Sequence, residues 1–284
     1  MNIEQALRTQ LAATFSSLNS VAAANAFPAP RTLSETLEKL APRGNLTEIR
    51  INPDSASYFA TAAVDMWLRS VHSFLVSASL TEASPIWASV SGYYSSHYAV
   101  RGLAHLLGYF QLFRRKKMVQ LRLERGQYIC SFKSKGGTGG EHQLYWKLVK
   151  QSAVFQGDGL FTENNPDLDT SDAKHRNHAN YSDHLANYPH FRALDERTAR
   201  DRIEYISKIV FDAPPLPRVS EFRDLAYVQV VAYHRLVRFR RMLDEILGGK
   251  NRFWKVHRNP PFAMGYVDFQ LAEGTGLTQP IKEQ

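Results

Sequence analysis

Residues 174–184 concentrate side chains that can bind anions or transfer protons. The segment has the sequence KHRNHANYSDH and includes Arg176, His178, Asn180 and Tyr181. Histidine titrates near neutral pH, so it can accept and release protons in a reaction. Arginine stays charged, and its planar fork can hold a phosphate or another acceptor. These residue types together favour a site that binds an anion and moves protons.

A second set of polar side chains recurs every four residues within the apolar stretch 86–118. On an α-helix a step of four residues advances only about 40° beyond a full turn, so the set forms one stripe. A charged arginine in such a helix needs a partner or a wet cleft. The members of the stripe are Tyr93, His97, Arg101 and His105.

Together the two sets predict a cleft whose walls are the stripe and the 174–184 segment. In metal-independent RNA cleavage, His97 or His178 would take the 2′-hydroxyl proton or protonate the leaving oxygen. Arg176 would stabilise the charge that grows on the phosphate. The alternative is structural, in which these side chains satisfy one another's hydrogen bonds between helices. The remaining ligand-binding candidates are Tyr93, Arg101, Asn180 and Tyr181.

The net charge of +8 indicates a polyanionic partner such as RNA or a nucleotide. Two local basic runs carry much of this charge, FRRKKM at 113–118 and RLVRFRRM at 235–242. The alternative for both runs is a solvated helix face. The RNA-binding candidates in these runs are Arg114, Arg115, Lys116, Lys117, Arg238, Arg240 and Arg241.

Composition also excludes several classes of protein. The single cysteine, Cys130, excludes a disulfide framework and fits a reducing compartment. The first ten residues lack the apolar core of a signal peptide, and charged residues interrupt the most apolar stretch, 59–80. The histidines around 174–184 match no zinc spacing. We therefore expect a cytoplasmic protein without membrane association, metal or other cofactor.

Hydrophobic periodicity predicts an all-α protein with one small β insertion. A short strand is expected at 47–51, and alternation about ERGQ predicts a protruding hairpin at 119–132. Apolar residues at helical spacing predict an antiparallel bundle of helices over 55–80, 86–118, 141–155 and 193–211. A further helix is expected at 220–247, ended by Gly248 and Gly249. The expected organisation is an N-terminal helical extension (1–54), the bundle with its hairpin (55–211), and a C-terminal helix and tail (212–284).

Two motifs resemble those of small prokaryotic HEPN-domain proteins. GYYSSHYAVRGLAHLL at 92–107 is similar to their YYAMFHAARALL-type helix, and RNHANYSD at 176–183 is similar to their later RNxADYD-type helix start. The resemblance covers residues 55–211 and implies a HEPN-like helical bundle. It also implies RNA-directed activity and often a homodimer. Two functions are compatible with it. One is a ribonuclease toxin restrained by a nucleotidyltransferase antitoxin or another defence-system subunit. The other is a non-catalytic module that binds RNA, nucleotide or a protein.

Departures from the family pattern bear on catalysis. The family's Phe-His pair is His97-Tyr98 here, and its aspartate is Asn180, which cannot neutralise Arg176. The ribonuclease branch has Arg, four to six residues, then His, a pattern that Arg176 does not meet. Arg252 and His257 meet it, beside a Gly-Gly break that disfavours a helix. The missing motif favours the non-catalytic function, whereas the stripe favours the catalytic one.

Overall fold

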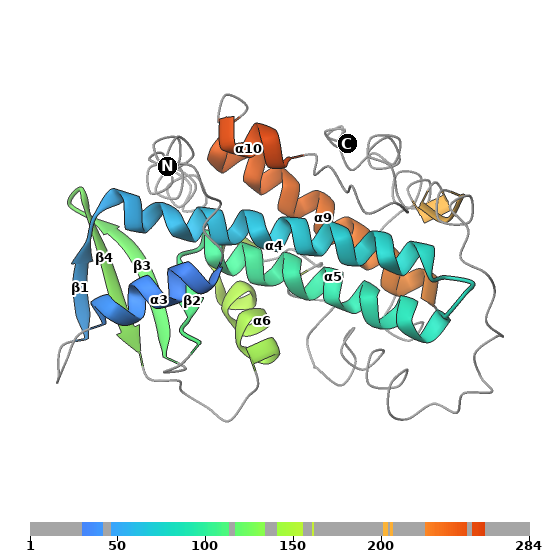
Figure 1. Cartoon of the computed structure of the whole chain (residues 1–284), viewed down its shortest axis with the longest axis horizontal. Coiled ribbons are helices and arrows are strands. Elements are labelled where there is room, and N and C mark those ends of the chain that lie inside the picture. Colours follow the sequence, from blue (N-terminus) through green and yellow to red (C-terminus); the bar gives the residue numbers. More distant parts are fainter. Residues whose placement is uncertain are drawn as a thin grey trace. The chain divides into compact units, whose positions relative to one another are not determined.

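The computed structural model describes residues 30–41, 47–113, 117–133, 141–155, 161, 201–203, 205–206, 225–248 and 252–258 of the 284-residue chain (Figure 1). The elements of this part include six α-helices and one four-stranded antiparallel sheet. The prediction of an all-α fold is therefore wrong, because the chain combines helices with a sheet.

Three of the helices, α3, α4 and α5, begin at a proline. Proline suits the first position of a helix, where its missing N–H would have had no partner. The predicted helices at 55–80 and 220–247 are confirmed, and the one at 141–155 becomes α6 followed by a short 3-10 turn. The bounds are α3 Pro30–Leu40, α4 Pro53–Ser79, α5 Pro85–Leu106, α6 Glu141–Gln151, α9 Leu225–Leu247 and α10 Arg252–His257.

The sheet has the strand order β1-β4-β3-β2. The turn between β3 and β4 contains Arg125 and Gly126, both with positive φ (50° and 76°), as the type I′ turn of a two-residue hairpin requires. The hairpin and the strand at 47–51 are therefore confirmed. The hairpin does not protrude, however, because its strands form the centre of the sheet, so that part of the prediction is wrong. The bounds are β1 Glu48–Ile51, β2 Tyr109–Gln111, β3 Met118–Glu124 and β4 Gln127–Lys133.

The expected helix over 86–118 is also wrong, because α5 ends at Leu106 and the chain enters β2. Gly108 marks the change of direction. It has φ 84°, and its N–H donates to the carbonyl of His105 at 2.9 Å. A Cβ atom at this position would lie 2.5 Å from the carbonyl oxygen of Leu121 in β3. Only glycine therefore permits both the turn and the close approach of the sheet.

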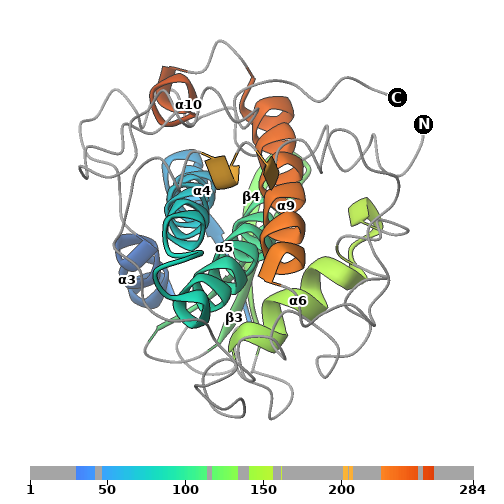
Figure 2. The same ribbon diagram turned by 90° about the vertical axis from the view of Figure 1, so that its right-hand side faces the viewer.

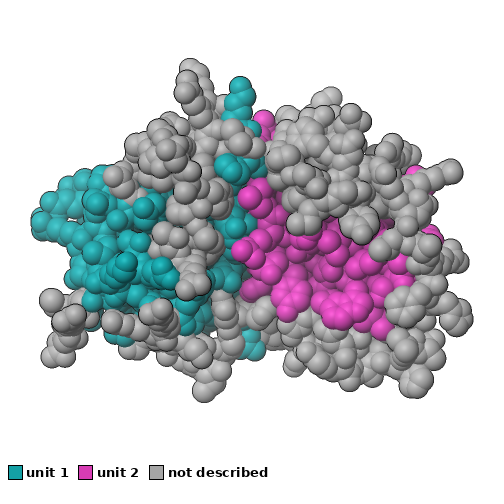
Figure 3. Space-filling model, viewed as in Figure 1, with its two compact units in different colours: residues 1–66, 100–156, 242–257 teal, residues 67–99, 157–241, 258–284 magenta. Residues whose placement is uncertain are grey.

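The chain divides into two compact units, each made of three separate stretches of the sequence (Figure 3). Unit 1 comprises Met1–Met66, Val100–Gln156 and Met242–His257, and unit 2 comprises Trp67–Ala99, Gly157–Arg241 and Arg258–Gln284. Unit 1 contains the sheet, one face of which is apolar and buried. Its core includes an edge-to-face contact of Phe59 with Phe110, at 6.3 Å between ring centroids. The buried residues of that face include Phe110, Val119, Leu121, Cys130 and Phe132.

Unit 2 is built from parts of α4, α5 and α9 (Figure 2). Phe74 contacts Tyr233 at 5.5 Å between ring centroids. The hydroxyl of Ser70 donates to the carbonyl of Ser95 at 2.6 Å, which satisfies a polar group between α4 and α5. Gly92 lets α9 approach closely, since a Cβ there would lie 2.9 Å from a Val228 methyl. In the part of the chain that the structure describes, no helix has the length and apolar character needed to cross a membrane.

The role of Gly108 predicts a large loss of stability on substitution. Gly108→Ala should lower the free energy of unfolding by about 1 kcal/mol for the positive φ, and by about 1–3 kcal/mol more for the contact with Leu121. Gly126→Ala is the matched control, because Gly126 also has positive φ (76°) but nothing lies within 4 Å of its added Cβ. Urea unfolding followed by circular dichroism measures both. Equal losses in the two variants would contradict the proposed close approach.

Candidate functional site

Helix α5 carries the whole stripe, which the two units share. Tyr93 and His97 belong to unit 2, whereas Arg101 and His105 belong to unit 1. Each half lies in its own surroundings, so the chemistry available to each is considered separately.

The unit 2 half of the stripe is buried among aromatic rings. His97 is 3% exposed, and its ring stacks on that of Tyr93 with 6.2 Å between centroids and 7° between planes. The rings of Tyr94 and Tyr98 contact His97 as well. A proton carrier must reach both substrate and water. The surroundings of His97 are instead those of a packed core residue.

In unit 1, Tyr145 of α6 lies between the two remaining members of the stripe. The Arg101 guanidinium lies 5.3 Å from the centre of the Tyr145 ring, a cation–π contact. The His105 ring meets the same ring edge-to-face, at 5.6 Å and 89°. Arg101 is half-buried and His105 is fully buried. Tyr145 is not among the residues predicted from the sequence, because nothing in α6 sets it apart from an ordinary core aromatic.

His105 is held neutral by its surroundings. Its Nδ1 lies 2.8 Å from the carbonyl oxygen of Tyr109, and since a carbonyl only accepts, Nδ1 carries the proton. Among the described residues its buried Nε2 has no hydrogen-bond partner, so a second proton there would be a buried charge without an acceptor in this part of the chain. Burial, and then the charge of Arg101, lower the pKa of His105 to about 3, against the opposing effect of the bond to Tyr109. At neutral pH, His105 cannot serve as an acid.

The hydrogen bond from His105 to Tyr109 is one of three that side chains make to backbone groups along the outer edge of β2. The backbone groups of Gly108 and Leu112 face the other way, toward the β3 side. The N–H of Leu121 donates to the carbonyl of Gly108 at 2.8 Å, and the N–H of Leu112 donates to the carbonyl of Lys117 at 2.9 Å. Alternation then directs the backbone groups of 109, 111 and 113 away from the sheet. The N–H of Gln111 donates to the Tyr145 hydroxyl at 3.1 Å, and the N–H of Phe113 donates to the Ser34 hydroxyl at 2.9 Å. We call His105, Tyr145 and Ser34 the β2 cap.

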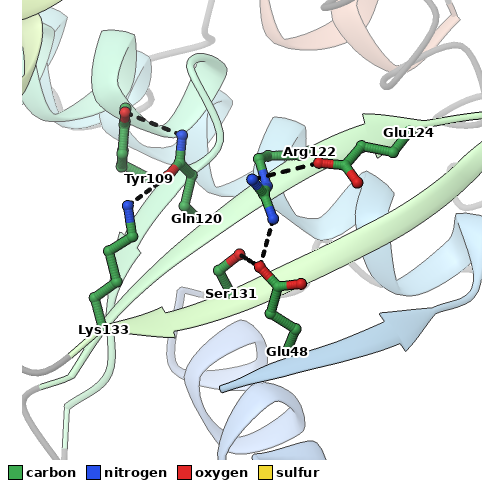
Figure 4. A network of polar contacts seen from close by, with 7 residues as sticks. All are labelled: Glu48, Tyr109, Gln120, Arg122, Glu124, Ser131 and Lys133. Carbon is green, nitrogen blue, oxygen red and sulfur yellow. Dashed lines mark hydrogen bonds and ion pairs between the residues drawn. The ribbon is translucent and has the colours of Figure 1, made fainter. Parts of the chain in front are cut away.

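The polar face of the sheet carries a network of ionic and hydrogen-bonded side chains (Figure 4). The Arg122 guanidinium lies between the carboxylates of Glu48 and Glu124, and Glu48 also accepts a hydrogen bond from Ser131 at 2.9 Å. Beside them, Gln120 donates to the Tyr109 hydroxyl at 3.1 Å and accepts from Lys133 at 3.3 Å. Two carboxylates thus offset the charge of Arg122 within the face.

The first basic run lies in the connection between β2 and β3, and its described residues, Phe113, Lys117 and Met118, are not helical. Its ends are fixed by the Gln111–Met118 pair and by the bond from Leu112 to Lys117. Lys133 pairs with Met118, so it lies at the same end of the sheet. Phe113 is 47% exposed there. We call the run 113–117 together with Lys133 the basic sheet end.

The second basic run lies on α9. Residues 235–241 of this run belong to unit 2, and Met242 belongs to unit 1. Arg238 is exposed and Arg241 is half-buried, but Arg240 is only 5% exposed. The three arginines therefore do not share one exposed face. The second run offers less accessible charge than its composition indicates.

The other predicted site residues lie outside the described residues. They are Arg176, His178, Asn180 and Tyr181 of the 174–184 segment, and Arg114, Arg115 and Lys116 of the first basic run. The cleft between the stripe and that segment stays a prediction. Arg252 and His257 lie at the two ends of α10, so the expectation that this stretch disfavours a helix is wrong. Among the described side chains, no three His, Cys, Asp or Glu residues gather as a metal-binding group.

Comparison of the chain with protein-family models, with curated proteins and with solved structures finds no match in any of the three.

The β2 cap predicts a specific cost for removing one hydroxyl. Tyr145→Phe leaves the buried N–H of Gln111 without an acceptor and should lower the free energy of unfolding by about 1–3 kcal/mol. Tyr109→Phe is the matched control, because the Tyr109 hydroxyl is part-buried and bonds only to the Gln120 side chain. It should cost less than about 0.5 kcal/mol. Urea unfolding of both variants tests the cap, and a larger loss in the control would contradict it.

The neutral state of His105 predicts how stability depends on pH. A histidine in the unfolded chain titrates near pH 6.5, whereas the pKa of His105 in the folded chain is about 3. Below pH 6.5 the unfolded chain therefore binds a proton that the folded chain does not. The free energy of unfolding should fall by up to about 1.4 kcal/mol per pH unit at this one site, until the pH reaches the folded pKa. Above pH 6.5 the site adds no slope.

Urea unfolding between about pH 7 and pH 5 measures this slope, and His105→Gln should reduce it. The variant should not abolish the slope, because burial, and then Arg238 and Arg235, lower the pKa of His234 to about 4. A slope that is the same with and without His105 would show that this histidine is not held neutral.

Proposed function

We propose that this protein binds RNA at the basic sheet end and does not cleave it. The observation that carries the proposal is the placement of the first basic run in the β2–β3 connection, beside Lys133 and the exposed ring of Phe113. Consecutive Arg and Lys residues in a short connection give a dense local charge, which attracts the phosphates of a nucleic acid. The net charge of +8 acts in the same direction.

Phe113 gives the basic sheet end a second means of binding. Single-stranded RNA binds proteins through phosphate contacts and through bases that stack on aromatic rings. Phe113 is exposed and immediately precedes the basic residues of the run. Binding of this kind is tolerant of sequence, because every base has a face that can stack. We therefore propose single-stranded RNA as the class of ligand.

The state of the histidines in the stripe supports binding without cleavage. His97 is 3% exposed among aromatic rings, and His105 is buried, neutral and bonded to the backbone. Neither is placed to pass protons to a phosphodiester at neutral pH. Of the two functions that the HEPN resemblance implies, we therefore propose the non-catalytic module, acting in the cytoplasm. We do not propose the ribonuclease toxin.

The proposal predicts a change in the salt dependence of RNA binding. Arg115→Gln with Lys117→Gln removes two charges from the basic sheet end. The slope of log affinity against log salt should become less steep by about 1.4, since each phosphate contact on a single strand contributes about 0.7. Affinity near 50 mM salt should fall at least about tenfold. Fluorescence anisotropy with a labelled single-stranded RNA of mixed sequence measures both quantities.

The control variant, Lys39→Gln with Lys147→Gln, removes two exposed charges from α3 and α6 in the same unit. It has the same net charge as the test variant and should keep the wild-type slope. Equal effects of the two variants would mean that binding follows net charge alone, and the assigned site would be wrong. The same mixtures, analysed on a denaturing gel, should show intact RNA. Cleavage that His97→Ala abolishes in a folded protein would overturn the non-catalytic proposal.

A further inference from the structure

Strand β1 presents an open edge to solvent. It pairs with β4 on one side, where the N–H of Phe132 donates to the carbonyl of Thr47 at 2.6 Å. Alternation therefore directs the backbone of Ile49 toward β4, and that of Glu48 and Arg50 away from it. Among the described residues nothing hydrogen-bonds to these outward backbone groups. The side chains of Glu48 and Arg50 are exposed, and β1 is an outer strand of the sheet (Figure 1).

The other edge of the sheet behaves differently. There the side chains of the β2 cap bond to three outward backbone groups, the carbonyl of Tyr109 and the N–H groups of Gln111 and Phe113. An open edge is a template for a further strand, and proteins commonly cover, charge or pair it. Side chains thus bond to part of the outer edge of β2, whereas the described residues provide no partner for the outward backbone groups of Glu48 and Arg50 in β1. We therefore expect a further strand to pair with the sheet at β1.

We propose that β1 pairs antiparallel with β1 of a second copy of this chain, about a two-fold axis through Ile49. In this register the outward backbone groups of Glu48 face those of Arg50 in the second copy, and the reverse holds on the other side of the axis. Each such pair exchanges two backbone hydrogen bonds. The same register sets each Glu48 carboxylate opposite an Arg50 guanidinium, a favourable cross-strand pair.

The order of charges favours a second copy over an unrelated strand. Glu48 and Arg50 flank an apolar residue, so the sequence is complementary to itself only when the two strands run antiparallel. A two-fold contact of this kind uses the same patch on both chains and closes after two copies. Glu48 already accepts bonds from Arg122 and Ser131. A carboxylate has about four acceptor positions, so it can also accept a bond from Arg50 of the second copy.

The length of β1 sets the strength of this contact. The strand has only four residues, so edge pairing buries less surface than a stable dimer requires. The dimer should accordingly be in exchange with monomer at concentrations of about 10–100 µM. Sedimentation velocity over a series of protein concentrations around this range should show the mass rising toward that of a dimer. A monomer at every concentration would overturn the proposal.

Cysteine cross-linking tests the register. The two copies of residue 49 form a pair without hydrogen bonds, with Cα atoms about 4.5 Å apart, which a disulfide can span. Ile49→Cys should therefore form a disulfide-linked dimer on mild oxidation. Arg50→Cys is the control, because its two copies would lie about 8 Å apart, beyond disulfide reach. Arg50 is the more exposed position, so random collision would favour the control. Cross-linking of both variants to the same extent, or of neither, would overturn the register.

Charge complementation between two variants provides an independent test of the dimer contact. Glu48→Lys and Arg50→Glu each create two like-charge pairs across the axis and should each weaken the dimer roughly tenfold. Mixed together, the two variants restore both opposite-charge pairs and should form a heterodimer with about wild-type affinity. Failure of the mixture to recover, with both variants folded by circular dichroism, would overturn the ionic part of the contact. Neither substitution alters a residue of the basic sheet end, so this test stands apart from the proposed function.

Discussion

Unit 1 depends on satisfying the outer edge of a three-residue strand, β2. A strand this short contributes few hydrogen bonds of its own, and the bond to the outward N–H of Gln111 is buried. An unsatisfied buried backbone group costs about 1–3 kcal/mol. Three helices therefore each supply one side chain to this edge: His105 from α5, Tyr145 from α6 and Ser34 from α3. The same three bonds fix these helices against the sheet.

This constraint accounts for the state of residues that look catalytic in the sequence. His105 must donate from Nδ1 to the backbone, so its tautomer is set, and burial of the other nitrogen prevents a second proton. Tyr145 accepts from the backbone while its ring contacts Arg101 and His105. A histidine, an arginine and a tyrosine in contact thus form part of the packing between a helix and a sheet edge. Residue types and helical spacing alone cannot separate this arrangement from a catalytic one.

The sequence predicts features that depend on neighbouring residues and misses those that depend on distant pairing. The β3–β4 hairpin is predictable, because Arg125-Gly126 suits its turn and the flanks alternate. β1 is short but alternates, so it is predicted too. β2 is missed because three residues show no periodicity and follow an apolar helix; Gly108 is the only local signal of the break. The central position of the hairpin rests on pairing β4 with β1, many residues earlier, which no local pattern encodes.

The distribution of charge in unit 1 follows from the same sheet. On the polar face, Glu48 and Glu124 lie beside Arg122 and offset its charge. The β2–β3 connection contains only basic residues after Phe113 and is not opposed by a carboxylate in its own sequence. The proposed RNA-binding surface lies at this end of the sheet, where Lys117 and Lys133 lie, while the proposed dimer contact lies at the β1 edge, which carries Glu48 and Arg50. Because the two surfaces use different residues, a nucleic acid and a second chain need not compete for the same contacts.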